Sequence, residues 1–191
     1  MMKNNSDKRP HFYITTPIYY INSEPHIGSA YTTIACDVAA RYMKANNYDV
    51  KFLTGTDEHG QKIQRTAEKL GITPKEFANN ISQKFRDLVK LMNCEPSHFE
   101  AIKDDFIRTT NPQHEKTIQF IWKQLEKNGW LYKSSYAGWY CVSDEAFYEE
   151  SELIDGKTSL GKDVEWVEEE NYFFRLSEFQ KVLLALYKHY P

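Results

Sequence analysis

Long apolar runs, a secretion signal and a surplus of basic residues are all missing from this chain. No apolar run approaches the roughly 20 residues that a helix needs to span a bilayer, so we expect no membrane segment. The polar stretch 1–10 lacks the apolar core of a secretion signal, which predicts a disordered tail and a cytoplasmic location. A formal net charge of −3 in 191 residues provides no overall electrostatic reason to bind nucleic acid.

Cysteine is also scarce, and its placement argues against disulfide bonds. Cys36, Cys94 and Cys141 are widely spaced and odd in number, which fits a reducing compartment. Aromatic residues, in contrast, make up 15% of the chain, with 13 tyrosines and 4 tryptophans. Such residues build folded cores and small-molecule pockets alike, so their abundance excludes a disordered chain without indicating a function.

The stretch 15–29 has the parts of a nucleotide-binding site. The apolar run 12–16 predicts a short buried strand, a loop with two prolines follows, and a helix begins near Ile27 or Gly28. Free backbone N–H groups and the helix dipole favour anions at such a helix N-terminus. His26 stands there and can donate to a phosphate, and Gly28 lacks the Cβ that would keep a flat ring or phosphate off the backbone.

A second strand and loop complete a site at one edge of the predicted sheet. Residues 27–47 are predicted to form a helix because apolar side chains recur every fourth residue, at Ile34, Val38 and Tyr42. Residues 50–54 predict a second strand, which ends in the loop 55–60. Strand, helix and strand within about forty residues are typical of a right-handed βαβ unit with parallel strands. The loops 17–28 and 55–60 therefore lie at the same edge of the sheet. Asp57 and His59 of the second loop are expected near the first loop.

Further helices and a β-rich module follow along the chain. The pattern predicts helices over 61–70, 74–93, 112–127 and 178–190. Thr73 is the expected N-cap of the second of these, with Glu76 three residues later, and Ser177 is the expected cap of the last. A short strand is expected near 99–102. The aromatic, alternating stretch 130–174 predicts antiparallel strands in a small module inserted into the α/β domain.

Two long blocks of motif residues stand at 15–31 and 52–63. They contain Thr-Thr-Pro-Ile-Tyr-Tyr-Ile-Asn, Pro-His-Ile-Gly-Ser-Ala-Tyr and Phe-Leu-Thr-Gly-Thr-Asp-Glu-His-Gly-Gln-Lys-Ile. These blocks, together with 138–141 and 168–176, closely resemble the start of methionyl-tRNA synthetase, a class I aminoacyl-tRNA synthetase. The resemblance implies an α/β fold, with a Rossmann-like parallel sheet of the HUP type and a small β-rich connective insertion.

The resemblance also implies how the chain is divided. The expected parts are a tail, the first half of a nucleotide-binding catalytic domain, the insertion and a final helix, over 1–10, 11–129, 130–174 and 175–191. The family's second signature loop, the remaining pocket residues and the anticodon-binding domain lie later than Pro191. We therefore expect this chain to be truncated before the second half of the catalytic domain, and to be inactive by itself.

The resemblance implies a methionine–tRNA ligase. Such an enzyme activates methionine with ATP to methionyl-adenylate and pyrophosphate, then transfers the methionyl group to the 3′ end of tRNA(Met). The implied partners are methionine, tRNA(Met) and ATP, which enters with Mg²⁺ as a substrate. His26 and Ser29 match catalytic signature positions, and the resemblance implies that both bind ATP together with Gly28.

A methionine pocket is implied at the neighbouring positions. Pro17, Ile18 and Tyr20 match residues that line it, and an apolar, aromatic-lined pocket suits a thioether. Asp57 matches the acidic residue that pairs with the α-ammonium group of the substrate, as a carboxylate can do directly. For His59, both a ligand contact and a structural hydrogen bond stay open.

The chain departs from the family pattern at two sites. Ser29 stands where the family usually has a second histidine; a hydroxyl bonds phosphate but carries no charge, so its share of transition-state stabilisation is smaller. Many members carry a zinc ion on paired cysteines in the insertion. Here Asp144 follows Cys141 by three residues and no second pair lies near 158–161. Because structural zinc needs four ligands, we predict no structural zinc and no other metal site.

Two other classes of function stay open at this point. The chain could come from a class I synthetase for another apolar amino acid, or from a related nucleotidyltransferase with the same signature. It could also be a non-catalytic paralogue that binds methionine or tRNA. The amino acid that supports pyrophosphate exchange distinguishes these alternatives.

Overall fold

The computed structural model describes residues 9–99 and 106–190. The chain divides between Glu115 and Lys116 into two compact units. The first unit contains a parallel sheet with helices, and the second contains an antiparallel sheet with helices before and after it.

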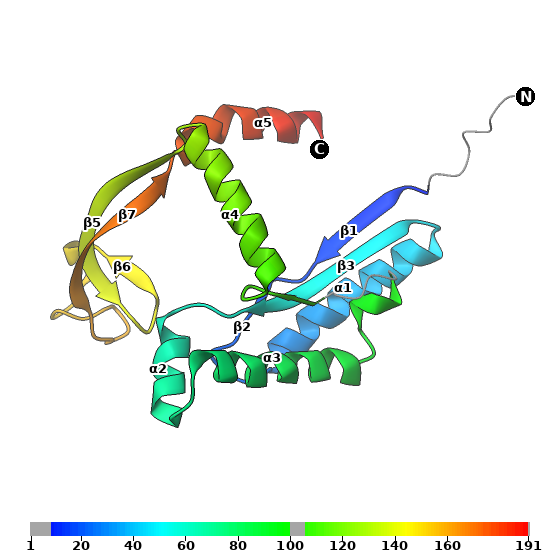
Figure 1. Cartoon of the computed structure of the whole chain (residues 1–191), viewed down its shortest axis with the longest axis horizontal. Coiled ribbons are helices and arrows are strands. Elements are labelled where there is room, and N and C mark those ends of the chain that lie inside the picture. Colours follow the sequence, from blue (N-terminus) through cyan, green and yellow to red (C-terminus); the bar gives the residue numbers. More distant parts are fainter. Residues whose placement is uncertain (1–8, 100–105, 191) are drawn as a thin grey trace, which may run out of the picture. The chain divides into compact units, whose positions relative to one another are not determined.

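The first unit is built on a parallel sheet with β3 (Asp49–Asp57) at its centre (Figure 1). Strand β1 (His11–Thr15) pairs with the first half of β3, and β2 (Tyr19–Tyr20) pairs with its last residues. Strand β4 (Phe106–Arg108) pairs with β3 over 54–56. All three pairings are parallel. They confirm the predicted α/β class and its parallel βαβ unit.

Three long helices belong to this sheet. Helix α1 (Ile27–Ala45) connects β1 and β2 to β3, and α2 (Gln61–Leu70) follows β3. Gly71 ends α2 with φ 69°, a left-handed conformation that glycine adopts without strain. Helix α3 (Pro74–Leu91) begins after Thr73, as predicted. A glycine in the left-handed conformation therefore sets the end of α2, and a capping residue sets the start of α3.

The segment after α3 differs from expectation. The helix ends at Leu91 instead of continuing to 93, because Asn93 has φ 57°, a left-handed conformation that stops a helix. A 3₁₀ turn, Pro96–His98, follows. The strand expected near 99–102 falls almost entirely outside the described residues, so it stays untested.

Thr73 and Glu76 form a full capping box at the start of α3. The Thr73 hydroxyl accepts from the Glu76 N–H at 3.2 Å, and the Glu76 carboxylate accepts from the Thr73 N–H at 2.9 Å. Thr73→Ala removes the first bond, so we expect the first turn of α3 to lose about 1 kcal/mol. Amide hydrogen exchange of that turn should accelerate about fivefold. Glu76→Gln keeps an acceptor and should change exchange less; equal effects from both variants would contradict this account.

Helices α1 and α3 cover the same face of the sheet and both lie beneath the strands in Figure 1. Alternate residues of β3 point to that face. Val50 and Phe52 pack there against Ala40 of α1, while the Thr56 hydroxyl lies 3.1 Å from that of Ser82 on α3. The face is thus apolar near the start of β3 and carries buried hydroxyls near its end. A second apolar core involves α2, α3 and β4 and contains Ile21, Ile63, Ala67, Phe77, Ala78, Ile81, Phe85 and Phe106.

Helix α1 forms as predicted, but it buries small and polar side chains. Its buried residues are Ser29, Thr33, Asp37 and Ala40. The apolar residues that predicted the helix lie on its exposed side: Ile34, Val38 and Tyr42. A reason is visible at Tyr19, whose hydroxyl meets Thr33 Oγ1 at 2.7 Å and donates to the Ser29 carbonyl at 3.1 Å. A polar partner on β2 therefore bonds the N-terminal part of the buried polar face of the helix.

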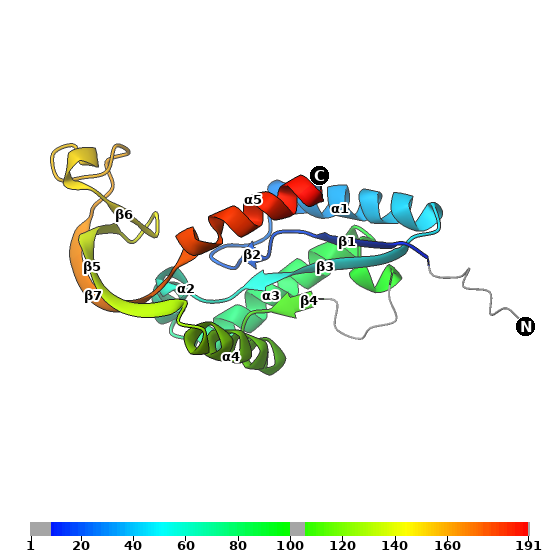
Figure 2. The same ribbon diagram turned by 90° about the horizontal axis from the view of Figure 1, so that it is seen from above.

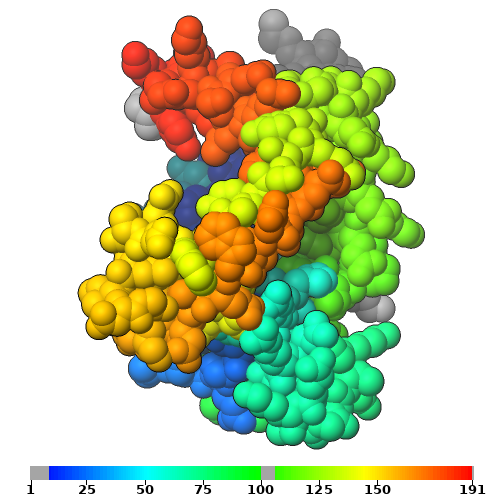
Figure 3. All heavy atoms as spheres, turned by 90° about the vertical axis from the view of Figure 1, so that its left-hand side faces the viewer, coloured from blue at the N-terminus to red at the C-terminus, as the bar shows by residue number. Residues whose placement is uncertain are grey.

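Helix α4 (Pro112–Lys127) spans the division of the chain, and an antiparallel sheet follows it. Strand β5 (Leu131–Cys141) pairs with β6 (Ala146–Tyr148) and with β7 (Glu165–Phe174), and β5 and β7 curve together as a long ribbon (Figure 2). The yellow residues between β6 and β7 gather into a lobe beside the orange β7 (Figure 3). The predicted β-rich, aromatic module is confirmed as an antiparallel sheet.

Aromatic pairs hold this second sheet together. Trp139 and Trp166 face each other across β5 and β7 with ring centroids 5.3 Å apart. Tyr136 and Phe147 meet edge to face at 4.6 Å. Offset and edge-to-face pairs of this kind add stability beyond the area they bury. The aromatic residues singled out in the sequence therefore serve, at least here, as cross-strand packing.

The last helix begins later than predicted. A 3₁₀ turn, Leu176–Phe179, precedes α5 (Gln180–His189), whose N-cap is Phe179 without a side-chain hydrogen bond. Ser177 lies inside the 3₁₀ turn, so the expected cap at Ser177 is wrong. Among the helices of the described residues, none is long and apolar enough to cross a membrane.

Candidate active site

The two predicted loops meet at the carboxyl edge of the parallel sheet. Tyr20 lies opposite Asp57 in the β2–β3 ladder, and the Ile21 N–H donates to the Asp57 carbonyl at 3.3 Å. One correction concerns 55–57, which were expected in a loop and belong to β3. The strand continues because Thr56 has ladder partners on both sides, in β2 and in β4. Asp57 is therefore held as the last residue of a central strand.

His26 caps helix α1 with its own side chain. Its Nδ1 accepts a hydrogen bond from the Gly28 N–H at 3.1 Å, so this nitrogen carries no proton. In the neutral ring the proton then resides on Nε2, which is left as a donor. The ring is exposed at a helix N-terminus, where backbone dipoles favour anions. His26 can therefore donate to a phosphate without giving up its capping role.

Gly28 is required by this cap. A Cβ at residue 28 would lie 2.9 Å from His26 Cε1, closer than real Cβ atoms approach, and 3.1 Å from its Nδ1, tighter than most real contacts. The absence of a side chain at Gly28 lets the imidazole fold over the first turn of the helix. The residue pair His26 and Gly28 thus works as one unit in this structure.

Ser29 lies differently from its two neighbours. It is buried within the packed side of α1, whereas His26 and Gly28 are exposed. Its carbonyl accepts from the hydroxyls of Tyr19 and Thr33. The geometry brings His26 and Gly28 together at the surface and places Ser29 against the sheet. A phosphate contact by Ser29 stays a prediction.

The predicted methionine residues separate into a half-buried and an exposed pair. Tyr20 is half-buried and packs against the core formed with α2 and α3. Asp57 is half-buried, and its Oδ1 accepts from the His59 N–H at 3.5 Å. Pro17 and Ile18 are exposed in the loop before β2. The structure brings Tyr20 and Asp57 next to each other, and a pocket role for all four stays a prediction.

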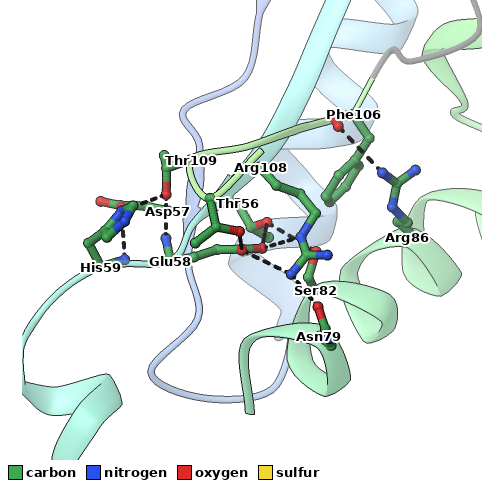
Figure 4. A network of polar contacts seen from close by, with 11 residues as sticks. Thr56, Asp57, Glu58, His59, Asn79, Ser82, Arg86, Phe106, Arg108 and Thr109 are labelled. Carbon is green, nitrogen blue, oxygen red and sulfur yellow. Dashed lines mark hydrogen bonds and ion pairs between the residues drawn. The ribbon is translucent and has the colours of Figure 1, made fainter. Parts of the chain in front are cut away.

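Glu58 is the central polar residue that sequence reasoning missed (Figure 4). Its side chain is fully buried, and its Oε1 accepts from Arg108 Nε at 2.6 Å and from the Thr56 hydroxyl at 2.8 Å. Its Oε2 accepts from Arg108 Nη2 at 3.0 Å and from the Thr110 hydroxyl. We call Glu58, Arg108, Thr56 and Thr110 the Glu58 clamp. The only sequence feature that pointed to this role of Glu58 was its position between two candidate site residues, Asp57 and His59.

The clamp holds Glu58 in its charged form. Burial on its own raises the pKa of Glu58, but hydrogen bonds from Arg108, Thr110 and Thr56 and the charge of Arg108 outweigh it and keep the pKa below the ordinary 4.5. Both carboxylate oxygens are occupied by donors, so this group has no free lone pair suited to take a proton from a substrate. Glu58 is therefore a structural anion within the site.

The charge of Glu58 makes stability depend on pH. A carboxyl whose pKa is lowered by folding stabilises the protein above its unfolded value of about 4.5, and this contribution disappears as pH falls through the folded pKa. Glu58→Gln leaves Arg108 without its partner, so we expect a loss of about 3–5 kcal/mol at pH 7. The difference from wild type should shrink below pH 4.5.

Urea unfolding at a series of pH values measures this difference. Glu68→Gln, at an exposed glutamate of α2, is the matched control and should leave stability nearly unchanged. A loss in Glu58→Gln that is the same at pH 3 and pH 7 would contradict an ionic clamp. The comparison therefore separates the charge of Glu58 from its packing.

Polar side chains around Cys141 in the second unit contact one another. Asp144 pairs with Lys162 and accepts from the Tyr148 hydroxyl at 3.0 Å, and the buried Cys141 Sγ lies 3.2 Å from Ser143 Oγ. Within 9–99 and 106–190, no group of three or more histidine, cysteine, aspartate or glutamate side chains is placed to hold a metal ion. The absence of structural zinc stays a prediction.

Comparison with known proteins identifies the family. The family described as tRNA synthetases class I (M) matches residues 12–154. The chain belongs to this family. Membership in the class I (M) synthetases agrees with the parallel sheet of the first unit.

Individual relatives of this class I (M) chain are similar over almost its full length. It is 49% identical over 181 residues to a methionine–tRNA ligase of Rickettsia felis, covering 94% of this chain and 34% of the relative. It is 50% identical over 185 residues to one of Thermotoga maritima, covering 94% of this chain and 28% of the relative. The chain therefore spans about a third of the length of these curated relatives.

A solved structure of the family is also similar. Mycobacterium tuberculosis methionyl-tRNA synthetase in complex with methionyl-adenylate superposes with a TM-score of 0.82 at 41% identity, covering 95% of this chain and 35% of that one. A leucyl-tRNA synthetase of Agrobacterium radiobacter, at 21% identity and a TM-score of 0.67, shares the fold. The Rossmann-like class I architecture with its antiparallel module is thereby confirmed.

Proposed function

We propose that this chain forms the first part of the catalytic domain of a methionine–tRNA ligase. The observation that carries the proposal is that two chemically different groups lie at the same edge of the sheet. His26 presents an N–H donor at a helix N-terminus, and Asp57 presents a carboxylate at the end of β3. A donor for phosphate and an anion for an ammonium group are what joining an amino acid to ATP requires.

The proposed first reaction is formation of an adenylate. The carboxylate of methionine attacks the α-phosphorus of ATP, the new acyl–phosphate bond forms, and the bond to the β-phosphate breaks to release pyrophosphate. Positioning and charge stabilisation carry such a displacement. His26 Nε2–H donates to phosphate oxygens as charge develops on them, Gly28 keeps the backbone accessible, and Ser29 is assigned to the same ATP site. Mg²⁺ enters with ATP and neutralises part of its charge.

The amino acid is proposed to lie across the end of β3. Asp57 pairs with the α-ammonium group, which fixes the carboxylate of methionine toward ATP. Pro17, Ile18 and Tyr20 line the pocket for the thioether, where polarisable sulfur suits an aromatic wall. In the second reaction the methionyl group passes from the adenylate to the 3′ end of tRNA(Met), and AMP leaves.

The proposed domain division follows from the same assignment. Residues 11–129 form the first half of the nucleotide-binding domain and 130–174 the connective insertion, with 1–10 as a tail and 175–191 as a helix leading onward. Translation enzymes of this kind act on cytoplasmic substrates, so we assign the protein to the cytoplasm. No structural zinc is assigned to the insertion.

The test is ATP–pyrophosphate exchange by the full-length protein with each of the twenty amino acids in turn. We expect exchange with methionine alone. Exchange with another amino acid would retain the adenylate chemistry and overturn the specificity. No exchange from a folded protein would favour the non-catalytic alternative, with the uncharged Ser29 as the first residue to examine.

A further inference from the structure

We infer that Thr109 is a positioning residue for the amino acid substrate, acting through the backbone around Asp57. This inference rests on the proposed function. Thr109 follows β4 directly and is 9% exposed. It lies outside both stretches that the sequence pattern singled out as binding, yet it holds both residues next to Asp57. No sequence motif pointed to it.

Two hydrogen bonds from one residue bracket Asp57. The Thr109 N–H donates to the carbonyl of Thr56 at 3.2 Å, and the Thr109 hydroxyl accepts from the N–H of Glu58 at 2.9 Å. Thr56 precedes Asp57 and Glu58 follows it. The peptide units before and after Asp57 are thus both bonded to Thr109. These bonds fix the position of the Asp57 Cα and therefore the point from which its side chain extends.

The hydroxyl of Thr109 also reaches the next residue along the loop. His59 Nδ1 lies 3.0 Å from the same Oγ1 (Figure 4). A hydroxyl has one proton and two lone pairs. With the Glu58 N–H occupying one lone pair, the proton can be given to His59 Nδ1, which orients that ring. A single buried oxygen therefore organises the backbone and side chain that follow Asp57.

The Glu58 clamp explains why Thr109 stays in place. Arg108 and Thr110, its neighbours in sequence, both donate to the Glu58 carboxylate, and Arg108 Nη2 also donates to Asn79 of α3 at 2.8 Å. Three consecutive residues, 108–110, therefore bind Glu58. Thr109 accepts from the main-chain N–H of Glu58, and Arg108 and Thr110 donate to its carboxylate. The clamp supplies rigidity, and the Thr109 hydroxyl supplies the direct bond at the site.

The experiment compares Thr109→Val with Thr109→Ser in the full-length protein. Valine keeps the shape and removes the hydroxyl, while serine keeps the hydroxyl. By exchange assay we expect valine to raise the KM for methionine about tenfold or more and to leave the KM for ATP within about twofold, because only the ammonium partner moves. Serine should stay within about threefold of wild type for both substrates.

A second readout tests whether the effect passes through Asp57. 4-(Methylthio)butanoate is methionine without its amino group and should inhibit exchange competitively. Its inhibition constant should be unchanged in Thr109→Val within about twofold, since it has no ammonium group for Asp57 to bind. A parallel rise of this constant and of the methionine KM would show general distortion of the pocket and overturn the inference.

Controls separate this inference from the proposal on which it rests. Thr66→Val makes the same chemical change on α2, where the hydroxyl donates to the Lys62 carbonyl of the same helix, and should leave both KM values unchanged. Thr109→Cys, with a weak acceptor of similar size, replaces valine if that variant does not fold. If the wild-type protein shows exchange with methionine and Thr109→Val has an unchanged KM for methionine, the inference is overturned and the proposed function stands. Failure of wild-type exchange with methionine overturns the proposed function, and the inference falls with it.

Discussion

Replacing Asp57 by alanine in the full-length protein is expected to reduce kcat/KM for methionine in the exchange reaction to about 3% of the wild-type value or less. The change removes the carboxylate proposed to pair with the substrate's ammonium group at the half-buried end of β3. An ammonium group left without its partner in such a site costs about 2–5 kcal/mol, which corresponds to roughly 30-fold to several thousand-fold in kcat/KM.

Asp49→Ala provides the matched control for Asp57→Ala. Asp49 stands at the opposite end of the same strand and pairs with the exposed His11 at 3.2 Å. Surface pairs of this kind contribute little, so exchange should stay near the wild-type rate. Near-normal exchange in Asp57→Ala, or an equal loss in both variants, would contradict the assignment of Asp57 as the ammonium partner.

Replacement of His26 separates two roles of one side chain. His26→Asn keeps a good helix N-cap and removes the Nε2–H donor, so we expect kcat for exchange to fall about 10²- to 10³-fold while the KM for ATP changes little. His26→Ala should lose the same factor and additionally about 1 kcal/mol of stability at the start of α1. The reason is that a contact to developing phosphate charge strengthens in the transition state.

Steady-state exchange and thermal unfolding of both variants measure the two roles. Activity of His26→Asn close to wild type would mean that His26 acts only as a cap. A loss of ATP affinity with kcat intact would instead assign His26 to ground-state binding. In either case the Gly28 position offers no independent test, because a side chain there displaces the His26 ring itself.

Much of the first unit was predictable because its signals are local. The capping box at Thr73, the left-handed Gly71 and the strand–helix–strand order each depend on residues within a few positions of one another. The same holds for His26, which stands immediately before the helix it caps. Sequence reasoning therefore correctly predicted that the two loops meet at one edge of the sheet.

The errors arose where distant residues decide the structure. Glu58 and Arg108 are fifty positions apart, so no local pattern shows that they form a buried pair. On α1 the hydroxyl of Tyr19 from β2 bonds Ser29 and Thr33, a contact between segments that the apolar spacing of the helix does not reveal. The end of β3 likewise depends on ladder partners from two other segments. Tertiary context overrides local preference in each case.

The absence of a side chain at Gly55 is a condition for the contact between Glu58 and Arg108. A Cβ at residue 55 would lie 2.1 Å from the carbonyl oxygen of Ile107, so any larger residue displaces β4 from β3. Arg108 follows Ile107, and its reach to Glu58 requires that close spacing. In evolutionary terms Gly55 is coupled to the Glu58–Arg108 pair: as long as β4 pairs with β3 at Ile107, a codon change at Gly55 also displaces Arg108 from Glu58 and is disfavoured.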